Sequence, residues 1–266
     1  MLFSTIGWLF PLRRTSWKSF QPPRSGSPAR NCLNPLAPTS PLRIVASDSL
    51  GSDALFSLDA FANVALIRRH VKRGAAVFQM GDLSAAIYEI RCGFFKAANF
   101  HEMGHEQIVG FFMRGELFGL DGLGSGTYNC TATALEDSEV VVLPFALLQD
   151  GGGANQAMQR QLHQVLSREI TRDYGMMQLL GSMRADARLA SFLVNLSTRF
   201  ARQGYSGSEF ILRMTRDEIG SYLGLKVETV SRLFTEFQKR SLLKVQHKHI
   251  CILDTQGLRE LVAVHS

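Results

Sequence analysis

Several features are scarce in this sequence of 266 residues, and each scarcity excludes a class of protein. Only 4 cysteines occur, and their scattered spacing fits a reducing compartment rather than a disulfide-stapled secreted domain. The one apolar stretch at the start of the chain is too short to span a bilayer. No nucleophile, base and orienting residue form a catalytic motif, and no phosphate-binding loop is present. We therefore expect neither a membrane protein nor an enzyme.

Acidic residues are absent from the first 43 residues, which contain six basic ones. The net charge of +6 belongs to this segment, since the other 23 Lys and Arg balance 23 Asp and Glu. The segment also holds seven of the eight prolines, between Pro11 and Pro41. Such a composition cannot pack a core, so we expect residues 1–45 to be a disordered basic tail rich in Pro and Ser. A transit peptide fits the composition too, but we favour a flexible extension or a mis-assigned translation start.

The next segment, residues 46–150, alternates short apolar runs with glycines, as in VFQMGD, IYEIRCGFF and QIVGFFMRGELFG. Regular turn signals between β-rich runs predict an antiparallel barrel or roll. The run DGLGSG at Asp121–Gly126 is rich in glycine, yet no strand-to-helix unit surrounds it. We interpret these glycines as turns rather than as a nucleotide loop.

A long helix is predicted over 155–183, within a segment that spans 151–184. Apolar residues spaced by three or four form a coiled-coil-like stripe on it. Taken alone, such a stripe is more typical of packing within one chain than of a dimer interface. Asp173 is the one carboxylate in or beside this stripe. The members of the stripe are Leu162, Leu166, Ile170, Asp173, Met177 and Leu180.

The most informative segment runs from Met214 to Lys248 and predicts two short helices, a tight turn and a β-hairpin. Thr215 with Glu218 three residues later is a capping box, and Gly224 ends the first helix. This is the arrangement of a winged helix-turn-helix, within a domain over 185–266.

The second helix begins near Val227 and has two contrasting faces at about 100° per residue. Val230, Leu233, Phe234 and Phe237 share one face, and Glu228, Ser231, Arg232 and Thr235 share the other. An arginine can bind guanine, a glutamate can accept from cytosine, and a serine allows close approach. Taken alone, this pattern is most simply interpreted as an amphipathic helix with a solvated polar face. The turn and the hairpin favour DNA binding instead, and so does the charge, because Arg213–Lys248 contains eight basic and four acidic residues.

At these residues the chain resembles a known family. The run IGSYLGLKVETVSRLFTEFQK is similar to the recognition segment of the CRP/FNR superfamily, and its E-x-x-S-R pattern is similar to the FNR class. The segments Gly81–Ala97, Gly104–Gly126 and Arg188–Ser206 resemble the same class, so the similarity covers about 55–261. It implies an α+β protein with an N-terminal β-roll like a cyclic-nucleotide-binding domain, a long dimerisation helix and a C-terminal winged helix-turn-helix.

The resemblance also implies partners and site residues. We expect a cytoplasmic transcription regulator that binds double-stranded DNA of TTGAT type as a homodimer and whose β-roll loops contact RNA polymerase; activation and repression are both open. Lys226 stands where the family usually has Ser or Thr, so the helix loses an N-cap and gains a phosphate contact. The predicted DNA-binding residues are Thr215, Lys226, Glu228, Thr229, Ser231 and Arg232.

The cofactors of the family are not expected here. Oxygen sensors of the FNR class bind a [4Fe–4S] cluster through four cysteines, but this chain has only Cys32 near its start and Val141 at the expected fourth position. A cyclic AMP pocket needs an Arg for the phosphate, and the stretch GTYNCTATA has none. Haem or metal at His70, His101 or His105 is disfavoured. A thiol switch at Cys32 or Cys130 is disfavoured too.

Two alternatives remain open. In one, the β-roll senses a ligand and the helix-turn-helix is a protein contact. In the other, the protein is a redox or oxygen sensor with a non-standard cofactor, and only its signal differs.

Overall fold

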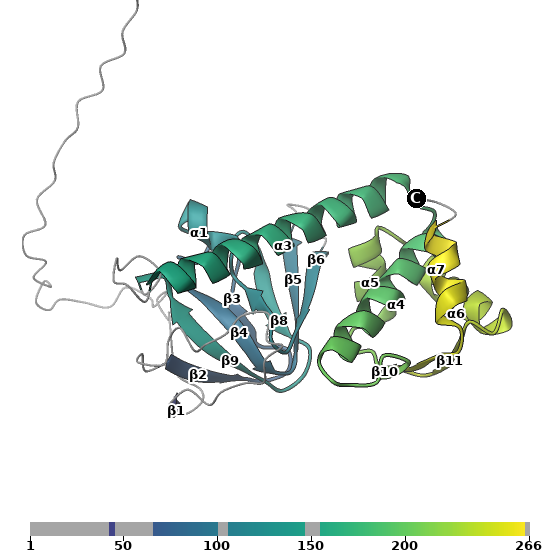
Figure 1. Ribbon diagram of the computed structural model, residues 1–266, viewed down its shortest axis with the longest axis horizontal. Coiled ribbons are helices and arrows are strands. Elements are labelled where there is room, and N and C mark those ends of the chain that lie inside the picture. Colours follow the sequence, from purple (N-terminus) through teal and green to yellow (C-terminus); the bar gives the residue numbers. More distant parts are fainter. Residues whose placement is uncertain (1–42, 46–65, 101–105, 147–154, 264–266) are drawn as a thin grey trace, which may run out of the picture. The chain divides into compact units, whose positions relative to one another are not determined.

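The computed structural model describes residues 43–45, 66–100, 106–146 and 155–263. Within these ranges an antiparallel β-roll comes first, a long helix follows, and a small α/β domain ends the chain (Figure 1). The expected α+β class is therefore confirmed. The strand Arg43–Val45 lies inside the range for which we predicted a tail, so β structure is present three residues earlier than the composition indicated.

Two antiparallel sheets form the roll. The larger sheet contains, in spatial order, β1 (Arg43–Val45), β2 (Leu66–Val71), β9 (Ser138–Pro144), β4 (Ala86–Cys92) and β7 (Leu117–Phe118). The smaller sheet contains β3 (Ala76–Phe78), β8 (Thr131–Ala134), β5 (Phe94–Phe100) and β6 (Glu106–Met113). Strand β6 is an edge of the smaller sheet.

Aromatic side chains fill the space between the two sheets. The rings of Phe78 and Tyr128 stack with their centroids 3.7 Å apart, and Phe118 lies 5.1 Å from Phe95 and 5.4 Å from Tyr88. Offset ring contacts of this kind add to the stabilisation from apolar burial. The roll therefore has a packed interior.

The predicted turns at Asp121–Gly126 include one short helical turn. Helix α1 (Gly122–Ser125) ends at Gly126, whose φ of 76° lies in the left-handed region that glycine tolerates best. Asp121 accepts hydrogen bonds from Asn129 and so ties the segment to the next strand.

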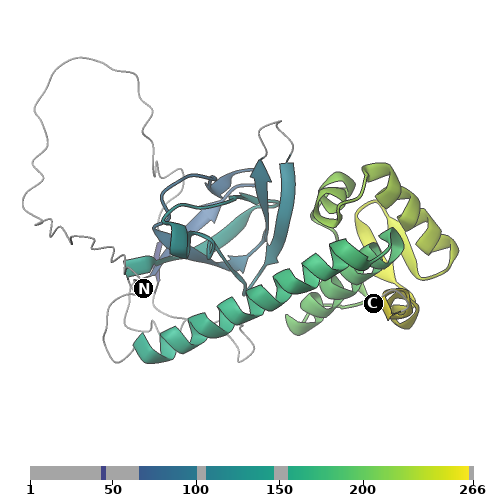
Figure 2. The same cartoon turned by 90° about the horizontal axis from the view of Figure 1, so that it is seen from above.

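Helix α3 (Asn155–Ser182) confirms the predicted long helix and runs as one unbroken helix (Figure 2). Its Val165 is buried against the outer face of the larger sheet, beside Val141 and Leu143. One side of this helix is thus used by its own chain.

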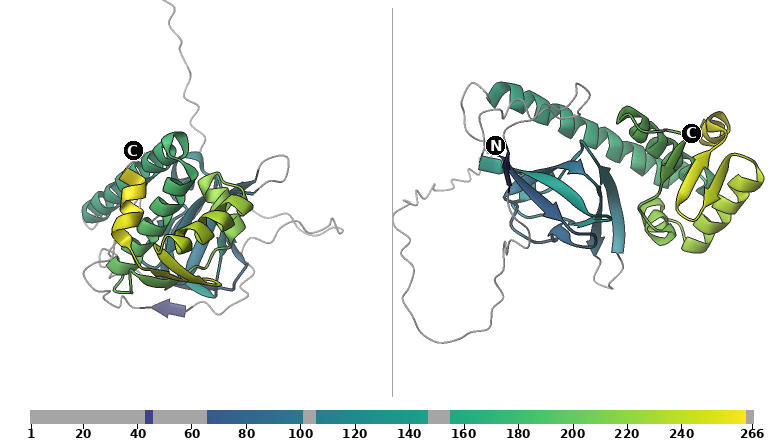
Figure 3. Two further views of the ribbon diagram at one scale, coloured as in Figure 1. Left: turned by 90° about the vertical axis from the view of Figure 1, so that its right-hand side faces the viewer. Right: turned by 90° about the horizontal axis from the view of Figure 1, so that it is seen from below.

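The C-terminal domain combines helices with a three-stranded sheet (Figure 3). Its helices are α4 (Ala185–Arg202), α5 (Arg216–Leu223), α6 (Val227–Lys239) and α7 (Thr255–Ala263). Its sheet has the order β10 (Glu209–Ile211), β12 (His249–Ile252) and β11 (Leu243–Gln246). None of the helices in the described ranges is long and apolar enough to cross a membrane.

Candidate DNA-binding interface

Helix α5 begins with the capping box that the sequence predicted. The amide of Glu218 donates to the Thr215 hydroxyl oxygen at 3.1 Å, and the Thr215 amide donates to the Glu218 carboxylate at 2.7 Å. These reciprocal bonds satisfy donors that the first helical turn leaves free. The helix ends at Gly224, with φ 62°. Both predicted ends of the first helix are confirmed.

Gly220 is a second glycine that this turn requires, and the sequence analysis missed it. A Cβ atom at Gly220 would lie 2.5 Å from the Leu225 carbonyl oxygen. The Leu225 amide also donates to the Gly220 carbonyl at 2.9 Å. The turn brings the two backbone segments together so closely that only glycine fits.

Helix α6 has the two faces that its sequence predicted. Val230, Leu233, Phe234 and Phe237 are buried. The opposite face is exposed to solvent, and its members are Glu228, Ser231, Arg232 and Thr235. Among the residues that the structure describes, none forms a hydrogen bond or ion pair with the side chains of Glu228, Ser231 or Arg232. The side chains suited to base edges are thus free to contact another molecule.

Three further predicted contacts flank this face. Lys226 is the N-cap residue of α6, is exposed, and makes no capping bond through its side chain, as predicted. Thr229 is half-buried in the first turn. The Thr215 hydroxyl accepts from its own helix, but its hydrogen remains available to a phosphate oxygen.

The hairpin β11–β12 forms the predicted wing. His247 occupies its turn with a φ of 56°, and the adjacent Lys248 is exposed. Lys248 Nζ donates to the Arg213 carbonyl at 3.1 Å. His249, two residues after His247, lies in strand β12, and its Nε2 is 2.9 Å from the Glu209 carboxylate. The exposed tip is therefore His247 and Lys248.

Two arginines that sequence reasoning did not single out hold α5 in place. The guanidinium of Arg216 lies over the ring of Phe234, and burial lowers the pKa of Arg216 to about 10. The guanidinium of Arg188 donates to the carbonyls of Leu180 at 2.7 Å, Met183 at 2.9 Å and Leu223 at 3.1 Å. These carbonyls belong to the ends of α3 and α5, which lack partners within their own helices. Arg188 thereby ties the long helix to the first helix of the helix-turn-helix.

The predicted stripe on α3 divides into two parts. Leu162 and Leu166 are half-buried, and Leu162 packs against the larger sheet. Beyond them Ile170, Met177 and Leu180 are exposed, with 54%, 68% and 36% of their surface accessible. Asp173 is exposed among them. Tyr174, four residues after Ile170, joins this stripe with 66% accessible and was missed.

Among the described residues of the roll, Glu116 and Tyr128 are engaged in contacts with the protein itself. Glu116 accepts from Arg199 through both carboxylate oxygens, at 2.9 Å and 2.6 Å, and from the Met113 amide at 3.0 Å. The ring of Tyr128 fills the interior, and its hydroxyl donates to the Ala86 carbonyl at 2.6 Å. Glu116 therefore has a structural role, and the donor set of this region does not fit a cyclic phosphate.

The donor set for an iron–sulfur cluster does not fit either. Val141 is a buried valine on β9, and Cys32 lies outside the described residues. Cys130 is buried, and burial together with the nearby Asp121 carboxylate raises its pKa to about 12. A thiol that resists ionisation is a poor ligand and a poor redox switch. No group of three or more His, Cys, Asp or Glu in the described part of the chain could hold a metal ion.

The histidines considered for haem are only partly described. His70 pairs with Glu139 at 3.3 Å on the larger sheet. His101 and His105 lie outside the described residues.

Comparisons with known proteins agree with this geometry. The cyclic nucleotide-binding domain family matches residues 68–150, and the Crp-like helix-turn-helix domain family matches residues 187–261. The chain is 41% identical over 199 residues to the transcriptional regulatory protein btr of Bordetella pertussis, covering 75% of this chain and 82% of that protein. It is 42% identical over 204 residues to the fumarate and nitrate reduction regulatory protein of Escherichia coli K12, covering 77% and 82%.

A solved structure is similar as well. FixK2 from Bradyrhizobium japonicum superimposes with a TM-score of 0.68 at 25% identity, covering 74% of this chain and 98% of that one. A β-roll joined to a winged helix-turn-helix with an exposed recognition helix defines a transcription regulator that binds DNA. The chain belongs to the CRP/FNR family.

Proposed function

We propose that the protein is a homodimer that binds a two-fold symmetric DNA site with FNR-like half-sites of TTGAT type. Helix α6 enters the major groove of each half-site. Arg232 donates to a guanine, Glu228 accepts from a cytosine, and Ser231 allows close approach. Lys226 and Thr215 bind phosphates, and Thr229 in the first turn of α6 contacts the DNA beside them. The observation that carries this proposal is the exposed outer face of α6.

The exposed stripe on α3 supports the homodimer. Ile170, Tyr174, Met177 and Leu180 form a row of apolar side chains open to solvent. A second copy of the same helix would bury this row through a coiled-coil contact. Pairing two α3 helices places two recognition helices about one turn of DNA apart, which is about 34 Å.

The test varies the DNA one base pair at a time. Fluorescence anisotropy would compare the intact palindrome with duplexes that carry a single substitution in one half-site. We expect each substitution at a contacted pair to cost about 1–3 kcal/mol. The same titrations at several salt concentrations address the alternative in which the helix-turn-helix binds protein. DNA binding predicts affinity that falls steeply with salt, and the alternative predicts no such affinity.

We further propose that this chain acts without a [4Fe–4S] cluster and without cyclic AMP. The support comes from Val141, from the bonds of Glu116 to Arg199, and from the ring of Tyr128 in the roll interior. Iron and sulfide assays on anaerobically purified protein test this directly. About four irons per chain, or absorbance between about 350 and 450 nm, would establish the sensor alternative instead.

The remaining partners follow from this reading. The protein works in the bacterial cytoplasm, because that is where its ligand, duplex DNA, is found. Loops of the β-roll contact RNA polymerase. A transcription assay with purified polymerase on a promoter bearing the palindrome checks that contact. Loss of DNA binding and loss of polymerase contact are separable, because the DNA-binding residues lie on α5 and α6.

A further inference from the structure

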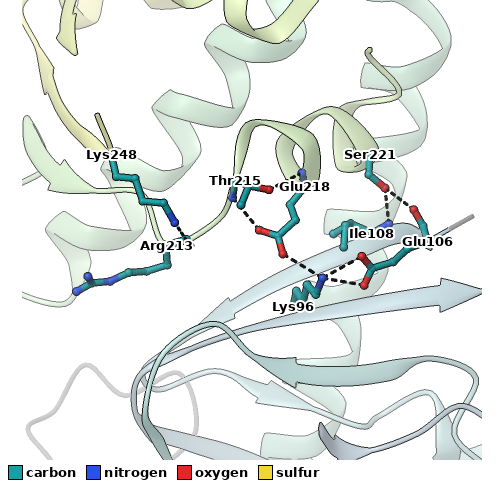
Figure 4. Close-up of polar contacts among 8 residues, drawn as sticks. All are labelled: Lys96, Glu106, Ile108, Arg213, Thr215, Glu218, Ser221 and Lys248. Carbon is teal, nitrogen blue, oxygen red and sulfur yellow. Dashed lines mark hydrogen bonds and ion pairs between the residues drawn. The ribbon is translucent and has the colours of Figure 1, made fainter. Parts of the chain in front are cut away.

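One serine of the helix-turn-helix covers the open edge of the β-roll (Figure 4). The Ser221 hydroxyl donates to the Glu106 carbonyl at 2.9 Å and accepts from the Ile108 amide at 2.9 Å. Gln107 Nε2 donates to the Ser221 carbonyl at 2.5 Å. An edge strand leaves alternate amides and carbonyls without partners. On β6, the Ser221 hydroxyl takes the place of a neighbouring strand.

A charged contact lies beside it. Lys96 Nζ on β5 lies 2.8 Å from the Glu106 carboxylate and 3.0 Å from the Glu218 carboxylate. Burial acts to lower the pKa of Lys96, but its hydrogen bonds to the two carboxylates outweigh that effect and raise it. The Lys96 and Glu218 side chains are only 13% and 15% exposed, so solvent screens this pair less than a surface pair. Glu218 also caps α5, so Lys96 of the roll contacts the first turn of this helix.

Apolar packing surrounds the polar contacts. The ring of Phe111 on β6 meets the ring of Tyr222 on α5 edge-on, with centroids 5.2 Å apart. Ile108 belongs to the same buried cluster as Phe234 of α6. The side chains of β6 and of the DNA-binding domain thus share one core. The polar contacts fix where α5 lies along β6.

We propose that Ser221 and Lys96 are positioning residues that dock α5 on β6 and thereby set the spacing between half-sites that the dimer accepts. The inference rests on the proposed function, because spacing has meaning only for a homodimer on a two-fold site. Neither residue lies on the outer face of α6, so neither reads a base. Their effect passes from α5 to α6, because the guanidinium of Arg216 on α5 lies over the ring of Phe234 on α6.

The experiment compares wild type with the double variant Ser221→Ala/Lys96→Met on duplexes whose half-sites are separated by three to six base pairs. Wild type should prefer a single spacing. For the double variant we expect the affinity ratio between the preferred spacing and its neighbours to fall about fivefold or more. Affinity for a duplex with one half-site should stay at the wild-type value, a readout that general unfolding would not preserve.

Matched variants keep the test sharp. Ser221→Thr keeps the hydroxyl and should keep the spacing preference. Lys239→Met removes an exposed lysine from the last turn of α6, and should leave the ratio unchanged. Lys96→Met alone should give part of the loss, and it serves if the double variant does not fold.

The outcomes separate the two proposals. If wild type binds no spacing better than scrambled DNA, the proposed function fails and the positioning role fails with it. If wild type prefers one spacing and both Lys96→Met and the double variant keep the same ratio, the positioning role alone is wrong.

Discussion

The guanidinium carbon of Arg216 lies 3.4 Å from the centroid of the Phe234 ring. Arg216 is the first residue of α5, and Phe234 is buried on the inner face of α6. The contact therefore joins the two helices of the helix-turn-helix and fixes the angle between them. A half-buried cation over an aromatic face contributes about 1–2 kcal/mol.

This contact predicts a coupling that a double-mutant cycle can measure. Arg216→Met and Phe234→Leu should each lower the free energy of unfolding, and the double variant should lose about 1 kcal/mol less than their sum. Urea unfolding gives all four values. Arg240→Met removes an arginine from the end of α6 and is the control, because its effect should add to that of Phe234→Leu. Additive losses would show that the stacking contributes nothing of its own.

Base contacts and phosphate contacts should respond differently to mutation. Arg232→Ala should cost about 1–3 kcal/mol on the palindrome and relax specificity at one base pair. Lys226→Ala should weaken all duplexes similarly and lower the salt slope by about one. Anisotropy titrations on specific and random DNA separate the two. Equal losses on both DNAs for both variants would contradict the assignment.

In the homodimer that we propose, the exposed stripe on α3 would bring two Asp173 carboxylates towards each other across the two-fold axis, and their repulsion should weaken the dimer. We expect Asp173→Ala to tighten the monomer–dimer equilibrium by about 1 kcal/mol, since a like-charge repulsion is removed. Sedimentation equilibrium measures the change. Asp217→Ala on α5 is the matched control. An unchanged equilibrium for Asp173→Ala would place this carboxylate away from the interface.

Glu89 predicts a pH dependence of stability. It is fully buried on β4, and no described residue bonds to its carboxylate oxygens. Burial raises its pKa from 4.5 to about 7, although Arg91 opposes the shift. Because the folded protein favours the protonated form, this contribution to stability is complete below about pH 4.5 and is lost as pH rises through about 7.

Replacement of Glu89 by a neutral amide should remove the loss of stability at high pH. Glu89→Gln should unfold like wild type at pH 4 and be more stable than wild type at pH 8 by up to about 3 kcal/mol. Thermal unfolding at the two pH values measures the difference. Glu260→Gln, at an exposed position of helix α7, retains Glu89 and should keep the wild-type pH profile. A Glu89→Gln variant with the wild-type pH profile would mean that Glu89 is ionised in the folded protein.

Local patterns explain which parts of the molecule the sequence predicted. The capping box at Thr215 and the two faces of α6 depend on residues within one or two turns, so spacing alone revealed them. The contact of Lys96 with Glu218 and the bonds of Arg188 join residues far apart in the chain. No local pattern encodes such pairs. The burial of Glu89 could not be predicted either, because its strand IYEIRC does not reveal which face of the larger sheet α3 covers.

We propose that a metal-free dimer recognises an FNR-like palindrome through the outer face of α6. An electrophoretic mobility shift with aerobic, metal-free protein on TTGAT-N4-ATCAA and on a scrambled duplex tests it most directly. The account predicts a specific shift on the palindrome, lost in Arg232→Ala. Absence of a shift until an anaerobic extract or a ligand is added would contradict it, and would show that a sensing chemistry controls this protein.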